Sequence, residues 1–252
     1  MTDEIPHEPA DLSSDSLSPS LARQRLVAVV ELILCSSVPT QILLQGLMVG
    51  LGWKPRSEDG GLSLSFVLTM SLADTAVLIA LMVALTRARG ESVSALWLGQ
   101  RRVWKEALLG VSLVPSIFLM VVVILTSVRL VAPVLHNVET NPLEEMATGG
   151  MMNAAAFGVV GILAGGVREE LQRAFMLRRF EYFGGAKVGV VVLSVAFGLG
   201  HVVQGWDAAV TTAALGFIWA VMYLWRRSSI APIVSHAGFN SIEVFRIAIA
   251  GP

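Results

Sequence analysis

Residues 107–128 read ALLGVSLVPSIFLMVVVILTSV and contain no Asp, Glu, Lys or Arg. A helix of about 20 such residues is long enough to cross roughly 30 Å of hydrocarbon. Two further stretches of similar length, residues 146–167 and 188–206, also lack charged side chains. These three stretches predict membrane-spanning helices, because a segment in lipid must satisfy its backbone hydrogen bonds internally.

Four further apolar stretches extend the pattern, at residues 26–53, 62–86, 208–225 and 228–250. None has the short alternating pattern of a transmembrane β-barrel. The sequence therefore predicts an all-α, polytopic transmembrane helical bundle of seven to eight helices. Residues 25–252 would form its single domain.

Composition excludes several classes of protein. Only 15% of the residues are charged, against about 25% in soluble domains, which excludes a water-soluble enzyme. The net charge of -1 argues against a nucleic-acid partner. The single cysteine, Cys35, excludes an internal disulfide framework and a thiolate metal cluster. The 23 glycines predict closely packed helices, since small residues let backbones approach in lipid.

The Lys and Arg residues predict the orientation. Residues 1–24 are acidic and rich in Ser and Pro, which predicts a disordered tail. The end of this tail and the segments 87–105, 168–187 and 226–227 hold 14 of the 18 Lys and Arg. By the positive-inside rule the N-terminus is cytoplasmic, in the plasma (inner) membrane if the source is bacterial, and residues 142–145 lie outside. Trp206, Trp219 and Trp225, near span ends, are predicted interface anchors.

A hairpin turning at Gly184–Gly185 places a carboxylate level with an imidazole. Glu169 lies 15 residues before the turn and His201 lies 16 after it, so in antiparallel helices the two side chains can meet. A helix from Gly149 to Phe183 would be about 50 Å long, too long for one crossing. We therefore expect a break at Gly165–Gly166 and a separate helix over residues 167–183.

Two pairs of residues spaced four apart add polar groups near the same level. His236 and Asn240 share one helical face, and so do Glu169 and Arg173. A glutamate in a low-dielectric pocket can take a proton from water. One imidazole can orient that water, while Asn240 and the other imidazole donate hydrogen bonds to an oxyanion. The set therefore indicates acid–base chemistry on water.

These residues resemble the three signatures of the CPBP family, the CAAX-protease and bacteriocin-processing membrane proteins that include the Ras-converting CAAX endopeptidase. The family pattern is Glu-Glu-x-x-x-Arg, then Phe-x-x-x-His, then His-x-x-x-Asn. The matching positions are Glu169-Glu170 with Arg173, Phe197 with His201, and His236 with Asn240.

The resemblance covers a catalytic core of about residues 145–245. It implies an eight-helix intramembrane glutamate protease with a cytosol-facing cavity. Glu169 would activate water with His201, whereas His236 and Asn240 would stabilise the oxyanion and Arg173 would brace the acids. The partners would be membrane lipids and a membrane-associated, possibly prenylated CAAX-type peptide.

The first motif departs from the family in its spacing. The family places Arg four residues after the second Glu, whereas Arg173 follows Glu170 by three. If the acids set the register, Glu169 is the base. If Arg173-Ala174-Phe175 sets the register, Arg168 occupies the position of the first Glu in the family pattern. Glu169 then becomes an acid that braces Arg173. Glu170, or no residue, would then be catalytic.

Several other interpretations stay open at this stage. The acids can be a solvated interfacial cluster, and the histidines can be simple hydrogen-bonding links between helices. Glu31 and Asp74 are expected to make structural hydrogen bonds, and Glu243 is expected to pair with Arg246. No cofactor is expected, because a zinc site with His-Glu-x-x-His is missing and Arg173 would oppose a cation. Two functions other than a protease are also considered. One is a catalytically inactive protein for partner binding or bacteriocin immunity, and the other is a proton-coupled transporter.

Overall fold

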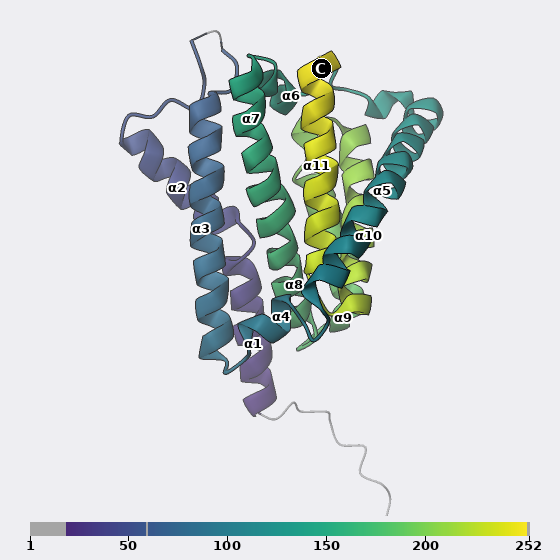
Figure 1. Cartoon of the computed structure of the whole chain (residues 1–252). Helices are drawn as coiled ribbons and strands as arrows, with labels where there is room; N and C mark the ends of the chain where they lie inside the picture. The colour runs from purple at the N-terminus through teal and green to yellow at the C-terminus, as the bar shows by residue number, and fades with distance from the viewer. Residues whose placement is uncertain (1–18, 59, 251–252) are drawn as a thin grey trace, which may run out of the picture.

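Helices make up nearly all of residues 19–58 and 60–250, the part of the chain that this computed structural model describes (Figure 1). They are α1 (Pro19–Leu34), α2 (Val38–Gly50), α3 (Leu64–Ala88), α4 (Val93–Trp97), α5 (Val103–Val131), η1 (Pro133–Leu135), α6 (Pro142–Ala147), α7 (Met151–Val160), η2 (Gly161–Arg168), α8 (Glu169–Phe180), α9 (Gly185–Leu199), η3 (Val202–Gln204), α10 (Trp206–Arg226) and α11 (Ile230–Ala250). Within these described residues the only β-type contact is an isolated bridge between Arg56 and Leu62. The predicted all-α bundle is confirmed.

Five helical stretches in the described chain are long and apolar enough to cross a membrane. They are Ser20–Gly50, Leu64–Ala88, Val103–Val131, Met151–Phe180 and Trp206–Arg226. The predicted span over residues 188–206 is shorter than expected, because α9 ends at Leu199 and η3 follows it. The chain is thus an integral membrane protein of several spans.

The N-terminal span is bent. Helix α1 ends at Leu34, and Ser37 adopts a left-handed backbone with φ 70° before α2 begins. Pro39 lies in the first turn of α2, where it lacks the N–H that would continue the helix. The expected single helix over residues 26–53 is therefore two helices. The predicted disordered tail, residues 1–24, is also too long, because α1 already begins at Pro19; residues 1–18 lie outside the described residues.

The predicted break at Gly165–Gly166 is wrong. Helices α7 and α8 are joined without interruption by η2, a π-helix over Gly161–Arg168, so residues 167–183 are not a separate helix. The two glycines allow close packing instead. A Cβ at Gly166 would lie 2.6 Å from the Ala237 Cβ and 2.8 Å from its Cα. Helix α11 therefore contacts the π-helix backbone directly, as the glycine content predicts.

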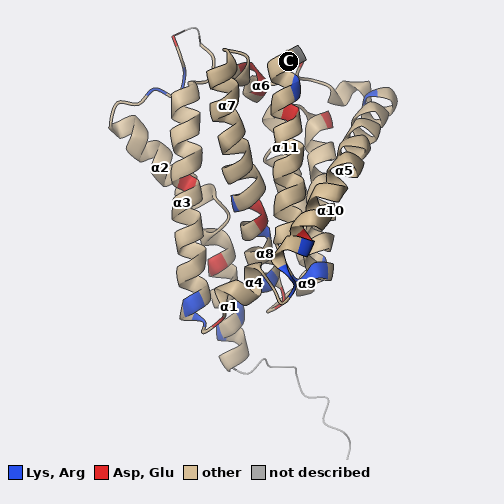
Figure 2. Cartoon of the chain, in the orientation of Figure 1, with Lys and Arg blue, Asp and Glu red and all other residues tan. Residues whose placement is uncertain are grey.

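Lys and Arg gather mainly at one end of the bundle, whereas Asp and Glu occur at both ends (Figure 2). We call the end with the start of α1 and the α3–α4, α8–α9 and α10–α11 connections the basic end. It carries Arg87, Arg89, Arg101, Arg102, Lys105, Arg178, Arg179, Lys187, Arg226 and Arg227. We call the other end, with residues 51–63, residues 132–150 and the end of α11, the opposite end. Most Lys and Arg therefore lie at one end of the bundle, as their positions in the sequence predict.

A buried ion cluster fixes the basic end. Arg179, 0% exposed, pairs with Glu31 at 2.6 Å and with Glu91 at 2.9 Å. Burial raises the pKa of the Glu91 carboxyl, but hydrogen bonds from Tyr182 and Arg179 outweigh this and hold that pKa below its ordinary value. Arg89 is the second partner of Glu31, at 2.8 Å. Glu31 therefore has the structural role expected of it.

Candidate active site

The second glutamate of the first motif is held on both sides. Arg173 donates from Nε and Nη2 to the two oxygens of Glu170, at 3.1 and 3.3 Å. The His236 Nδ1 lies 2.9 Å from Glu170 Oε1. All three side chains are buried. An N–H on Nδ1 leaves Nε2 of a neutral His236 ring as an acceptor.

Aromatic rings fix the His236 imidazole. The Trp219 ring stacks on it, with centroids 3.8 Å apart and planes 13° from parallel. Phe197 meets the same imidazole edge-on at 6.1 Å, and the Arg173 guanidinium lies 4.5 Å over the Phe197 ring. Trp219 is only 1% exposed. Its predicted role as an interface anchor is therefore wrong, and the sequence offered no signal for this stacking partner.

Glu169 has freer oxygens than Glu170. Its Oε1 accepts from Arg168 Nη2 at 3.3 Å, and its Oε2 lies 4.0 Å from His236 Nε2. The second distance is too long for a direct hydrogen bond. A polar contact of this length can be bridged by water.

His201 is level with the acids but does not bond to them. Arg173 lies four residues after Glu169, and Phe197 lies four residues before His201. The contact between Arg173 and Phe197 therefore confirms the expected register of the two helices. However, α9 ends at Leu199, and the His201 Nδ1 lies 2.8 Å from the Phe197 carbonyl oxygen. Among the described residues, no hydrogen bond or ion pair joins His201 to Glu169 or Glu170. The expected meeting of Glu169 and His201 is therefore not observed.

Asn240 is anchored on the π-helix. Its Nδ2 donates to the Gly161 carbonyl oxygen at 2.9 Å, and a Cβ at Gly165 would lie 2.5 Å from that Nδ2. The glycine therefore makes room for the amide. One of the two Nδ2 hydrogens remains for another acceptor.

His201, His236 and Asn240 line one cavity of about 710 Å³ together with Phe197 and Trp219. Ligand pockets are typically 300–1,000 Å³. Apolar side chains from α5, α10 and α11 form its walls, among them Phe118, Val122, Leu125, Leu215 and Phe239. From His236 the cavity extends to residues 136–144 and the end of α11, so it reaches the opposite end of the bundle.

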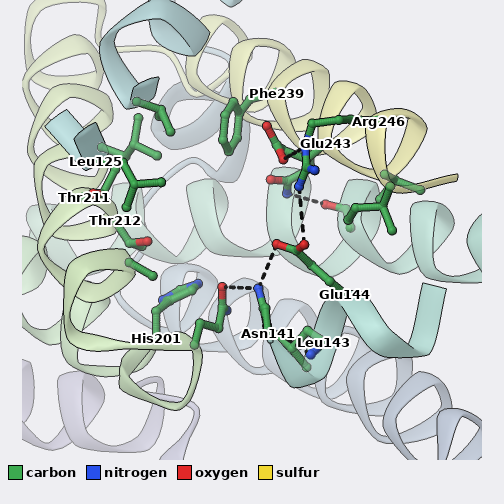
Figure 3. Close-up of a pocket in the computed structure, with 18 of the residues that line it drawn as sticks. Leu125, Asn141, Leu143, Glu144, His201, Thr211, Thr212, Phe239, Glu243 and Arg246 are labelled. Atoms are coloured by element: carbon green, nitrogen blue, oxygen red, sulfur yellow. Dashed lines mark hydrogen bonds and ion pairs between the residues drawn. The ribbon is translucent and has the colours of Figure 1, made fainter. Parts of the chain in front are cut away.

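A polar network surrounds this end of the cavity (Figure 3). Asn141 Nδ2 donates to Gln204 and to Glu144, each at 3.2 Å. Arg246 pairs with Glu243 at 3.0 Å, as predicted, and also with Glu144 at 3.3 Å. These contacts tie the segment before α7 to η3 and α11.

A second pair at the cavity was not predicted. His136 Nδ1 lies 2.9 Å from Asp207 Oδ2, and Arg129 Nε donates to the same oxygen at 2.8 Å. His136 and Arg129 both line the cavity. No sequence motif links His136 to Asp207, which lies 71 residues later.

No group of three or more His, Cys, Asp or Glu side chains suited to a metal ion was found in the described chain. A bound cation near Glu170 would also face the Arg173 guanidinium, 3.1 Å from that carboxylate.

Comparison with known proteins supports the family resemblance. Residues 151–242 match the family model described as type II CAAX prenyl endopeptidase Rce1-like. Neither the curated proteins nor the solved structures give a match. The matched range runs from the start of α7 into α11 and contains all three motifs. Over these residues the chain is therefore similar to the Rce1-like type II CAAX prenyl endopeptidases, as its motifs predict.

Proposed function

We propose that this chain is an intramembrane endopeptidase that hydrolyses a membrane-associated peptide with water activated by Glu169. The observation that carries the proposal is the 4.0 Å gap between Glu169 Oε2 and His236 Nε2. Both atoms are acceptors when the imidazole is neutral, so a water between them donates both of its hydrogens. Its oxygen lone pairs are then free to attack a carbonyl carbon.

Glu169 is the better base of the two acids. The carboxylate of Glu170 already accepts from Arg173 and contacts His236, and these charge-assisted bonds occupy the lone pairs that would take a proton. Glu169 takes the proton of the water as the carbon–oxygen bond forms. The carbon–nitrogen bond then breaks, and this proton passes to the leaving amine.

His236 and His201 exchange the roles that the family resemblance implies. His236 orients the water, because it is the imidazole near Glu169. The free Asn240 N–H donates to the oxyanion and the His201 imidazole lies beside it, since both side chains line the same cavity. No metal or other cofactor takes part in this proposal.

The form of the cavity suits an amphipathic substrate. Its walls are apolar, whereas its inner end carries the two imidazoles and its other end carries Glu144, Glu243 and Arg246. A peptide with a lipid anchor or an apolar segment can bury that part while its backbone reaches His236. Prenylated CAAX peptides are the first substrates to test, on the family resemblance.

The test is hydrolysis of a farnesylated CAAX peptide by purified protein in liposomes. E169Q and H236A should each lower kcat by at least about a hundredfold. E145Q is the matched control, because Glu145 is exposed at the opposite end and does not line the cavity. Undiminished hydrolysis by E169Q would refute the assignment of the base.

We also propose that the basic end faces the cytoplasm and that the N-terminus lies there. The cavity reaches the other end of the bundle, so the peptide would approach from outside the cytoplasm. This differs from the cytosol-facing cavity that the family resemblance implies. A membrane-impermeant maleimide on intact cells should label T148C and spare K187C, both in a C35S background. The reverse pattern would overturn the orientation.

A catalytically inactive, partner-binding protein is the second candidate. The Arg168 guanidinium bonds to Glu169 at 3.3 Å and occupies the first-Glu position in the register set by Arg173. In that register R168E would restore the family pattern and raise hydrolysis. In the register proposed above it removes a partner of Glu169, adds a like charge and lowers hydrolysis. The sign of the change distinguishes the two candidates.

A further inference from the structure

A second cavity, lined by polar and apolar side chains in equal number, borders Arg168 at the start of the first motif. Its volume is about 340 Å³, and side chains from α2 and α3, the α2–α3 connection and η2 line it. The polar members are Gln41, Gln45, Ser71, Asp74 and Arg168. The cavity holding His201 and His236 shares none of these residues.

Two opposite charges face this cavity without neutralising each other. Asp74, 2% exposed, accepts from Thr40 at 2.5 Å and from Gln41 at 3.4 Å. Arg168 bonds to Ser37 and Gln172, each at 3.0 Å, and its buried Nε has no partner. No ion pair between Asp74 and Arg168 is found within the described residues.

Charges inside a membrane protein require pairing or water. A polar cavity holds water when it offers several hydrogen-bonding groups, and each water takes about 30 Å³. The second cavity therefore has room for roughly ten water molecules.

Glu169 lines neither cavity but lies beside one lining residue of each. Its Oε1 contacts Arg168, which lines the second cavity. Its Oε2 is 4.0 Å from His236, which lines the first cavity. A peptide that fills the first cavity would block water from that side. Arg168 joins the second cavity to the same carboxylate.

We infer that the second cavity is filled with water and supplies it to Glu169 while the first cavity holds the peptide. The supply role rests on the proposed hydrolysis, whereas the hydration of the cavity does not. Arg168 and Asp74 act here as positioning residues for water. Hydration of the cavity and supply of water to Glu169 are tested separately, by measuring labelling and turnover on the same variants.

Hydration is tested by cysteine labelling in a C35S background, since Cys35 is the only cysteine. Ser71 lines the second cavity, whereas Leu72, the next residue of α3, does not line it and is 38% exposed. A charged, membrane-impermeant thiosulfonate reacts with a thiolate, which forms in contact with water. In proteoliposomes S71C should react at least about tenfold faster than L72C. Equal rates in folded protein would overturn the inference.

Turnover is tested on the same labelled proteins. The bulky charged adduct on S71C should lower kcat severalfold and leave KM unchanged, because the peptide binds in the other cavity. The adduct on L72C should leave both constants unchanged. Fast labelling of S71C with unchanged kcat would overturn the supply role alone. If the chain hydrolyses no peptide, the supply role fails with the proposed function, while the labelling rates still decide whether the cavity is hydrated.

Discussion

Gly166 sets the distance between the π-helix and α11, and G166A should therefore inactivate the enzyme without unfolding it. The new Cβ would lie 2.6 Å from the Ala237 Cβ, 2.8 Å from its Cα and 3.0 Å from its N. Ordinary carbon contacts are about 3.5–4.0 Å. Because backbone atoms cannot rotate away, the two helices must separate by about 1 Å.

This separation acts on the proposed water site. Ala237 follows His236 directly, so α11 carries His236 away from Glu169 and widens the 4.0 Å gap. A misplacement of about 1 Å can cost about a hundredfold in rate. The overpacking should lower the free energy of unfolding by only about 1–3 kcal/mol. We expect kcat to fall about a hundredfold, with a folded protein in thermal unfolding.

G158A is the matched control for this experiment. Gly158 lies on α7 and also faces α11, but the nearest atom to its added Cβ is the Val244 Cγ1 at 3.5 Å, an ordinary contact. G158A should keep the wild-type kcat. The reasoning is refuted if G166A hydrolyses peptide at the wild-type rate, or if G158A loses as much activity as G166A.

Three further substitutions test the buried contacts. E170Q removes the charge that neutralises the buried Arg173 and should lower the free energy of unfolding by about 3–5 kcal/mol, as measured by denaturation; a change below 1 kcal/mol would contradict the pairing. W219A removes the ring stacked on His236 and should cost about 3–5 kcal/mol of stability and lower kcat, whereas W219F should recover most of both. Glu91 has a lowered pKa, so its contribution is complete above the ordinary value of about 4.3 and is lost as the pH falls through the folded-state pKa. Thermal unfolding between pH 6 and pH 3 should show this loss in the wild type and a smaller one in E91Q.

Hydropathy predicts five of the seven expected spans, because lipid imposes the same requirement on each segment. The uncharged run at residues 107–128 lies inside α5, and that at residues 146–167 continues from α7 through most of η2. The bend at Ser37 was not predicted, although Pro39 follows it in the sequence. What apolar composition does not encode is the path between segments, so α1 and α2 were predicted as one helix.

The candidate site was predictable only where its residues lie close together in the sequence. The pairs of residues four apart, such as His236 and Asn240, follow from helix geometry alone. Trp219 and the pair of His136 with Asp207 could not be found in this way, because helices distant in sequence bring them together. Their identity depends on tertiary packing, which no local spacing records.

The shortened Glu-to-Arg spacing limits what the acidic motif can decide. Residues three and four apart are both neighbours on a helix, so Arg173 can bond to a carboxylate in either position, and it bonds to Glu170. The ion pair therefore forms even though the spacing is one residue shorter than in the family, and it does not identify the base. The π-helix that ends at Arg168 alters which side chains face α11 just before the motif. Our proposal of the base therefore rests on the acid that has one oxygen 4.0 Å from an imidazole, which is Glu169.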